Sequence, residues 1–378
     1  MTAPARSLMP DVLRGVAILG ILAVNMQDFA AYGEWQQRGL DRAAQVLIDV
    51  FANGRFIALF ALLFGWGLAD VTLRRGLGTA YRRLGALLLI GVLHAALLWR
   101  GDVIAMYALT ALPLPLLLRL KWHARTWAAL GVALIGAWLL HQGGQVLADL
   151  AQDGPRVLFP QPFPDQWSYL DTVRWRVMLL PRLLLGSWHF NLPWLGGLFL
   201  VGAALRQAGL LARPSRHLPL LRTLALSGLP LGLLLGLGLA WANALPTASG
   251  AALSILLRIG GGLVMAGGYF GLIGLWLSRA PDSRLSRALA ACGRLSLTHY
   301  LTQSLLMTLL FGPYGGSQGG GWGAAPALLL ALGVAALQLA FSAWYVPRYG
   351  RGPLERALRW LVYGGAATPH RGAQASRR

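Results

Sequence analysis

Cysteine and the familiar catalytic signatures are scarce in this sequence. The one cysteine, Cys292, cannot form an internal disulfide, and we expect it to pack as a small residue near the start of a membrane span. The sequence contains no phosphate-loop motif, no H-E-x-x-H, no cysteine–histidine metal cluster and no G-x-S-x-G elbow. ATP-driven pumping, zinc proteolysis and serine hydrolysis therefore lack support, and we predict no metal site.

Charge is also scarce, because only 12% of the residues are charged while 56% are hydrophobic. An ordinary soluble domain carries about a quarter of charged residues. A helix needs about 20 apolar residues to cross a bilayer, and ten stretches approach that length. We therefore predict an all-α, polytopic integral membrane protein with about ten transmembrane helices. The stretches are Val12–Ala31, Ala44–Val71, Leu84–Trp99, Val103–Leu118, Trp127–Leu147, Leu184–Leu205, Leu218–Ala244, Ala252–Leu277, Leu289–Phe311 and Ala325–Val346.

The charged residues that are present are mostly basic, and the formal net charge is +20. The arginines lie at the ends of the apolar stretches and do not form a basic domain, so we predict no nucleic-acid partner. They concentrate in the links on the side of the N-terminus. The positive-inside rule then predicts that both termini are cytoplasmic in a bacterial inner (plasma) membrane. The acidic residues favour the opposite side, which indicates chemistry at the outer face.

The sequence predicts one transmembrane helical domain over residues 1–364, with membrane lipids as its surroundings. Residues 151–183 are expected to form an outer loop with an interfacial helix, and residues 365–378 a basic cytoplasmic tail. Small residues let membrane helices approach closely, so the glycines of the seventh and eighth stretches predict close packing within the chain. Homo-oligomer formation through one of these glycine faces is the alternative.

Polar residues inside apolar stretches carry the functional prediction, because burying them in hydrocarbon is costly without partners or water. Arg14 and Asn25 are three helical turns apart, and Asp28 continues the same face of the first helix. We expect this face to point into the bundle or a hydrated cavity.

Further polar residues are predicted at the depth of the outer half of the membrane, where they would form a shared pocket. The competing interpretations are a membrane anchor for Arg14, structural ion pairs Arg55–Asp49 and Arg258–Asp28, and simple packing of His94. The catalytic candidates are His94, His299 and Asp102, and the substrate-binding candidates are Arg14, Asn25, Asp28, Asp49, Asn53, Arg55, Tyr107, Arg258 and Gln303.

Five segments that follow one another along the chain resemble the signature blocks of the YeiB-like bacterial inner-membrane family, the domain of unknown function 418. They are RGVAILGILAVN (Arg14–Asn25), NGRFIALFALLFGWGLA (Asn53–Ala69), YRRLGALLLIGVLHAALLWRGDVIAMYAL (Tyr81–Leu109), GRLSLTHYLTQSLL (Gly293–Leu306) and RGPLERALRWLVYG (Arg351–Gly364).

That family more distantly resembles the transmembrane acyltransferases. In their O-acetylating branch, an arginine of the first helix is followed, after ten residues, by a histidine that acts in acyl transfer. Asn25 stands at that position here. The heparan-type branch has this asparagine but supplies a histidine in the next loop, whereas residues 26–34 here contain none. Only Arg14 and Asn25 match by position.

Three functions remain open after this comparison. The resemblance implies an acyltransferase that uses acyl-coenzyme A as co-substrate, without a bound cofactor, and passes the acyl group to an envelope glycan or lipid. The second function is a transporter or flippase for a small metabolite or lipid. The third is a non-catalytic envelope scaffold whose polar residues form internal ion pairs.

Overall fold

The computed structural model describes residues 7–152, 154, 156, 167–186, 188–313 and 321–364, and this part of the chain contains helices but no strands. The predicted tail, residues 365–378, and part of the predicted outer loop lie outside the described residues. The α-helices are α1 Met9–Phe29, α2 Gly39–Phe51, α3 Arg55–Arg75, α4 Leu77–Leu97, α5 Ile104–Thr110, α6 Leu114–Leu117, α7 Ala124–Gln152, α8 Tyr169–Pro181, α9 Trp188–Gln207, α10 Leu218–Ala242, α11 Ala248–Arg279, α12 Arg284–Arg294, α13 Ser296–Phe311, α14 Ala324–Tyr349 and α15 Pro353–Tyr363.

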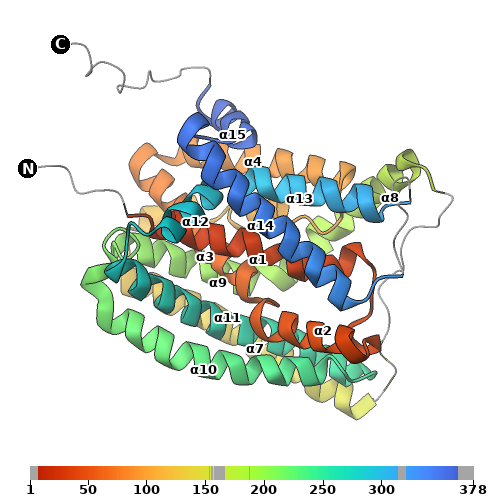
Figure 1. Ribbon diagram of the computed structural model, residues 1–378. Helices are drawn as coiled ribbons and strands as arrows, with labels where there is room; N and C mark the ends of the chain where they lie inside the picture. The colour runs from red at the N-terminus through yellow and green to blue at the C-terminus, as the bar shows by residue number, and fades with distance from the viewer. Residues whose placement is uncertain are drawn as a thin grey trace, which may run out of the picture.

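Long apolar segments confirm a multi-pass membrane protein. Among the described residues, 7 segments are long and apolar enough to cross a membrane. Figure 1 shows most of the long helices running in roughly the same direction, with the start of α1 and the whole of α15 at the same end of the bundle. The candidate spans are Met9–Phe29, Gly39–Arg75, Leu77–Leu97, Ala124–Leu150, Pro214–Ala242, Ala248–Arg279 and Ala324–Tyr349.

The second predicted stretch, Ala44–Val71, is broken into α2 and α3. Gly54, just before α3, has a φ of 81°, a left-handed conformation that glycine adopts without steric cost. A Cβ at Gly54 would also collide with the backbone carbonyl of Arg258 on α11. The break therefore depends on a glycine that both turns the chain and admits a neighbouring helix.

Three other predicted stretches also differ from continuous helices. Pro113, between α5 and α6, divides the fourth stretch, because proline lacks the amide hydrogen that continues a helix, and Pro115 lies in the first turn of α6. The ninth is divided into α12 and α13 at Leu295. The sixth begins later than expected, since residues 182–186 form a π-helical turn ahead of α9.

Glycines bring α10 and α11 into direct backbone contact, as the sequence predicts for close packing within the chain. A Cβ on Gly228 would lie 2.7 Å from the amide nitrogen of Gly268, and one on Gly271 would lie 2.5 Å from the carbonyl oxygen of Leu221. The two helices run side by side in Figure 1. Gly293 makes a similar close contact between α12 and α1, at the carbonyl of Asp11.

Helix α8 lies within the predicted outer loop. It starts with a capping box in which Ser168 and Asp171 bond each other's backbone amides. The Asp171 carboxylate is exposed, and the hydrogen bonds that it accepts from the hydroxyl and then from the backbone amide of Ser168 lower its pKa. Tyr169 and Arg176 donate to the carbonyl of Leu97 at the end of α4, both at 3.1 Å. This helix therefore covers the end of α4 that carries His94.

Candidate functional site

His94, in the last turn of α4, is paired with Asp102, in the link to α5. The distance from His94 Nδ1 to Asp102 Oδ2 is 2.7 Å, and the two side chains are 0% and 2% exposed. The other carboxylate oxygen, Oδ1, accepts the backbone amide of Ala105 at 2.6 Å. A carboxylate held at both oxygens fixes the imidazole and favours the tautomer with a hydrogen on Nδ1.

The second ring nitrogen of His94, Nε2, is buried and has no hydrogen-bond partner among the described residues. The centroid of the His94 ring lies 5.1 Å from that of the Tyr300 ring and 6.4 Å from that of the Trp99 ring. The tautomer set by Asp102 leaves a lone pair on Nε2. The pair His94–Asp102, hereafter the dyad, thus has the arrangement of a histidine base oriented by a carboxylate.

Asp28, at the C-terminal end of α1, contacts the same α4–α5 link. Its two carboxylate oxygens accept Trp99 Nε1 at 2.5 Å and Arg100 Nη2 at 2.8 Å. The predicted alternative of an ion pair between Asp28 and Arg258 is therefore wrong, because Asp28 pairs with Arg100 and Arg258 pairs with Glu34. Phe29 stacks on Trp99 with ring centroids 4.6 Å apart. These contacts fix the link that carries Asp102.

A small cavity of about 90 Å³ borders the dyad on the side of Asp102. A larger hollow of about 460 Å³ includes Lys121 and His123 but none of the predicted site residues. The small cavity is therefore the one that bears on the dyad. Its lining comprises Ala95, Arg100, Asp102, Met106, Leu180, Leu183 and Leu184.

His299 belongs to a second, separate network that joins α13 to α14 and α1. Its Nε2 lies 2.6 Å from the hydroxyl of Ser342, which donates to the carbonyl of Gln338 at 2.6 Å. Gln303 donates to Gln338 Oε1 at 2.8 Å and to the carbonyl of Ile18 at 3.1 Å. The side chains of His299 and Gln303 thus make contacts that hold helices together. The α13–α14 network consists of His299, Gln303, Gln338 and Ser342.

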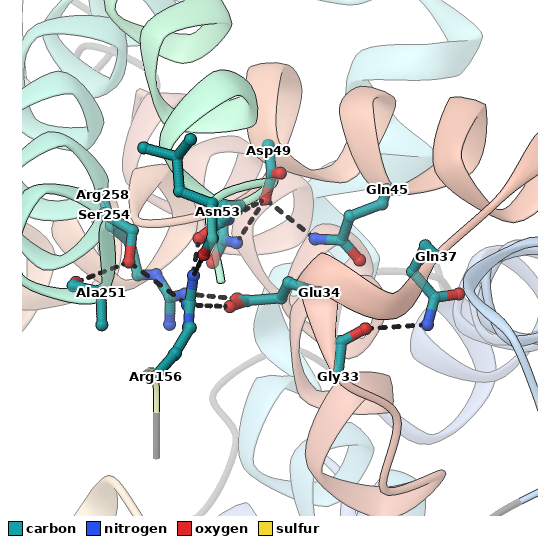
Figure 2. A network of polar contacts seen from close by, with 12 residues as sticks. Gly33, Glu34, Gln37, Gln45, Asp49, Asn53, Arg156, Ala251, Ser254 and Arg258 are labelled. Carbon is teal, nitrogen blue, oxygen red and sulfur yellow. Dashed lines mark hydrogen bonds and ion pairs between the residues drawn. The ribbon is translucent and has the colours of Figure 1, made fainter. Parts of the chain in front are cut away.

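A third network surrounds the break between α2 and α3. Figure 2 shows the Glu34 carboxylate facing two arginines, Arg156 and Arg258, and each of its carboxylate oxygens accepts from one of them. The Arg156 contact is 2.7 Å long. Burial lowers the pKa of Arg156, and the Glu34 carboxylate opposes that shift. The α2–α3 network consists of Glu34, Gln45, Asp49, Asn53, Arg55, Arg156, Asn243 and Arg258.

Asp49 lies at the centre of this network and is fully buried. Its Oδ1 accepts hydrogen bonds from the amide groups of Gln45, Asn53 and Asn243, all at 2.9 Å. Its Oδ2 has no partner among the described residues. Arg55 donates to the carbonyl of Asn53 rather than to this carboxylate. The expected ion pair Arg55–Asp49 is therefore absent from the part of the chain that the structure describes.

The other predicted residues join none of these networks. Arg14 pairs with Asp11 at 3.4 Å. Asn25 is half-buried on α1. The Tyr107 hydroxyl donates to the carbonyl of Ile57 at 2.7 Å, and its ring packs against Phe64 and Phe199. The predicted residues are therefore divided among several places and do not line one shared pocket.

Sequence reasoning missed Glu34, Arg156, Gln45 and Asn243 as members of a site. Glu34 and Arg156 lie in links between α-helices, Glu34 in a short 3-10 turn, so a search for polar residues inside spans does not select them. Two charges of opposite sign in these links, Glu34 and Arg156, were the available signal. What joins them is the packing of α2 against α10, which the sequence does not reveal.

Two curated proteins are similar to this chain over most of its length. The uncharacterized protein YxaH of Bacillus subtilis (strain 168) is 27% identical over 392 residues, which cover 93% of each chain. The uncharacterized protein YeiB of Escherichia coli (strain K12) is 31% identical over 336 residues, covering 81% of this chain and 83% of the relative. The family model described as "Protein of unknown function (DUF418)" matches residues 205–365. The chain therefore belongs to the YeiB-like DUF418 family.

Proposed function

We propose that this protein is an acyltransferase of the bacterial inner membrane, with His94 as general base and Asp102 as the group that orients it. The dyad carries the proposal, because the Nδ1 of His94 is held at 2.7 Å by Asp102 while its Nε2 has no partner among the described residues. A base needs this lone pair to take a proton from an attacking group.

The proposed reaction uses acyl-coenzyme A as co-substrate and an envelope glycan or lipid as acceptor. An acceptor hydroxyl attacks the thioester carbonyl while His94 Nε2 removes its proton. The carbon–sulfur bond then breaks, and the imidazolium returns the proton to the coenzyme A thiolate. Asp102 stabilises the imidazolium during this sequence, and Arg100, on the cavity wall beside Asp102, is the cation for an anionic part of a substrate.

The proposal includes a topology with ten crossings and both termini in the cytoplasm. Besides the continuous long helices, α2 with α3, α5 with α6, and α12 with α13 each count as one interrupted crossing, and α9 is a further one. The arrangement of basic residues supports this orientation. It puts the dyad near the outer face, where an envelope acceptor would reach it.

Transport of a small metabolite or lipid is the second candidate function. The interruption between α2 and α3, which carries Asn53 and lies beside Asp49, supports it. Transporters of several folds build substrate sites from interrupted helices at mid-membrane depth. Uptake or release of a substrate without any acyl donor would favour this function over acyl transfer.

Labelled acetyl-coenzyme A tests the acyl-transfer proposal directly. The purified wild-type protein is incubated with the labelled donor and an envelope extract, beside His94→Ala and the exposed-surface control Arg174→Gln. We expect labelled glycan or lipid with wild type and with the control, and none with His94→Ala. The proposal would be overturned if the wild type and both variants showed no donor binding and no labelled product.

A further inference from the structure

We propose that Arg55 is the anchor of a second ligand site, which binds the oxyanion of a small acid or a lipid headgroup inside the α2–α3 network. This site does not involve the dyad, and it does not depend on acyl transfer. Three features of the network support this site: its excess of positive charge, the unpaired edge of the Arg55 guanidinium and the acceptor groups around that edge.

The α2–α3 network holds more positive than negative charge. Its basic groups are Arg55, Arg156 and Arg258, and its acidic groups are Glu34 and Asp49. Both oxygens of Glu34 are already occupied by Arg156 and Arg258. Neither Arg55 nor Asp49 has an ion-pair partner among the described residues, and the three cations exceed the two carboxylates by one charge, which one bound anion would balance. Buried charges in proteins are generally paired.

Arg55 presents the edge of its guanidinium that suits an oxyanion. The side chain is 0% exposed, and only Nη1 is used, by the carbonyl of Asn53. Nε and Nη2 have no hydrogen-bond partner among the described residues. These two nitrogens form the side of the guanidinium whose parallel N–H groups bind both oxygens of a carboxylate or phosphate.

Gly236 on α10 leaves room for this guanidinium. A Cβ at Gly236 would lie 2.7 Å from Arg55 Nη2 and 2.9 Å from the Cα of Val50. Tyr269, on α11, bonds the carbonyl of Phe51 at 2.9 Å and so holds the end of α2 nearby. The position of Arg55 is therefore set by three helices that meet at the break.

The acceptors beside Arg55 indicate what the ligand carries besides its oxyanion. Gln45 Oε1, Asp49 Oδ2 and Asn53 Oδ1 are buried and have no partner among the described residues. A ligand with a hydroxyl or ammonium group close to its carboxylate or phosphate would donate to these oxygens. A phospholipid headgroup and a free hydroxy or amino acid share this chemistry.

Thermal stability in detergent with added anions tests the site. The probes are sodium phosphate, sodium acetate and the soluble short-chain lipid dihexanoyl-phosphatidylethanolamine, each compared with sodium chloride at equal ionic strength. Phosphate and acetate report the free acid, whereas a response to the lipid alone identifies a headgroup. We expect at least one probe to raise the Tm of the wild type in a saturable way.

Three variants decide whether Arg55 is responsible. Arg55→Gln should weaken binding of that probe by about 10- to 100-fold. Asp49→Asn removes a negative charge without changing the size of the side chain, so it should retain or strengthen binding of phosphate and acetate, which carry no ammonium group, and weaken binding of the ammonium-bearing lipid. Arg174→Gln, at an exposed arginine of α8, should behave as wild type. If Arg55→Gln does not fold, native mass spectrometry of the wild type and Asp49→Asn replaces the comparison. A wild type that retains none of the probes, or an Arg55→Gln protein that binds as tightly, would overturn the proposal.

Discussion

The carboxylate of Glu355, in the first turn of α15, caps the start of α13 in place of a residue of α13 itself. Its Oε1 lies 2.9 Å from the amide nitrogen of Leu297 and 3.0 Å from that of Thr298, and its Oε2 accepts the hydroxyl of Thr298 at 2.6 Å. The first amides of a helix have no partner within the helix. Glu355 therefore supports the helix that carries both His299 and Tyr300.

Removing the charge of this cap should destabilise the protein. We expect Glu355→Gln to lower the free energy of unfolding by about 1 kcal/mol, because helix caps contribute energies of this size. Arg351→Gln, at an exposed position just before α15, is the control. Thermal denaturation in detergent measures both, and equal Tm values for the two variants would contradict the role of Glu355 as a cap.

The two glycines Gly54 and Gly76 offer a matched test of the break between α2 and α3. Both have a φ of 81°, but a Cβ at Gly76 would meet nothing within 4 Å, whereas one at Gly54 would collide with Arg258. Gly76→Ala should cost only the strain of its backbone conformation, φ 81° and ψ 173°, about 1 to 3 kcal/mol. Gly54→Ala should cost at least about 2 kcal/mol more, because a helix must move. Similar Tm values for the two variants would show that α11 does not pack against this turn.

Ser342→Ala distinguishes a packing role of His299 from a catalytic one. The substitution leaves the buried Nε2 of His299 without its acceptor, which we expect to cost about 1 to 3 kcal/mol of stability. Ser278→Ala, which removes only a hydroxyl bonded to its own helix at Gly274, is the control. If His299 only packs, the acyl-transfer rate per folded protein stays unchanged, and a large loss of that rate would assign His299 to the chemistry.

The single cysteine allows the proposed orientation to be tested by labelling. In a Cys292→Ala background, we expect Arg174→Cys to react with a membrane-impermeant maleimide added outside intact cells. Arg351→Cys should react only after the membrane is permeabilised. Both positions are exposed. The reverse pattern would invert the topology.

The sequence predicted the elements that depend on local pattern. Long apolar stretches gave the membrane class and most of the helices, and the glycines of α10 and α11 gave their close packing. His94 and Asp102 are only eight residues apart across a tight link, so their proximity was also predictable. In each case the interaction is encoded within a short piece of chain.

The features that sequence reasoning missed depend on residues that are distant along the chain. The break between α12 and α13 at Leu295 is stabilised by Glu355 from α15. The residues next to Leu295 in the sequence do not predict this break. Arg258 was expected to pair with Asp28, yet Glu34 and Arg100 are the partners that packing supplies. Several cations and carboxylates occupy the same predicted depth, so depth alone could not choose among the pairs.

Acyl transfer from labelled acetyl-coenzyme A by the Asp102→Asn variant is the most direct test of the account. The substitution keeps the size of the side chain but no longer fixes the tautomer of His94, so we predict a fall in rate of at least about 100-fold, with the wild-type Tm largely retained. The same fall is expected for His94→Gln. A wild-type rate in both folded variants would contradict the assignment of the dyad as the general base.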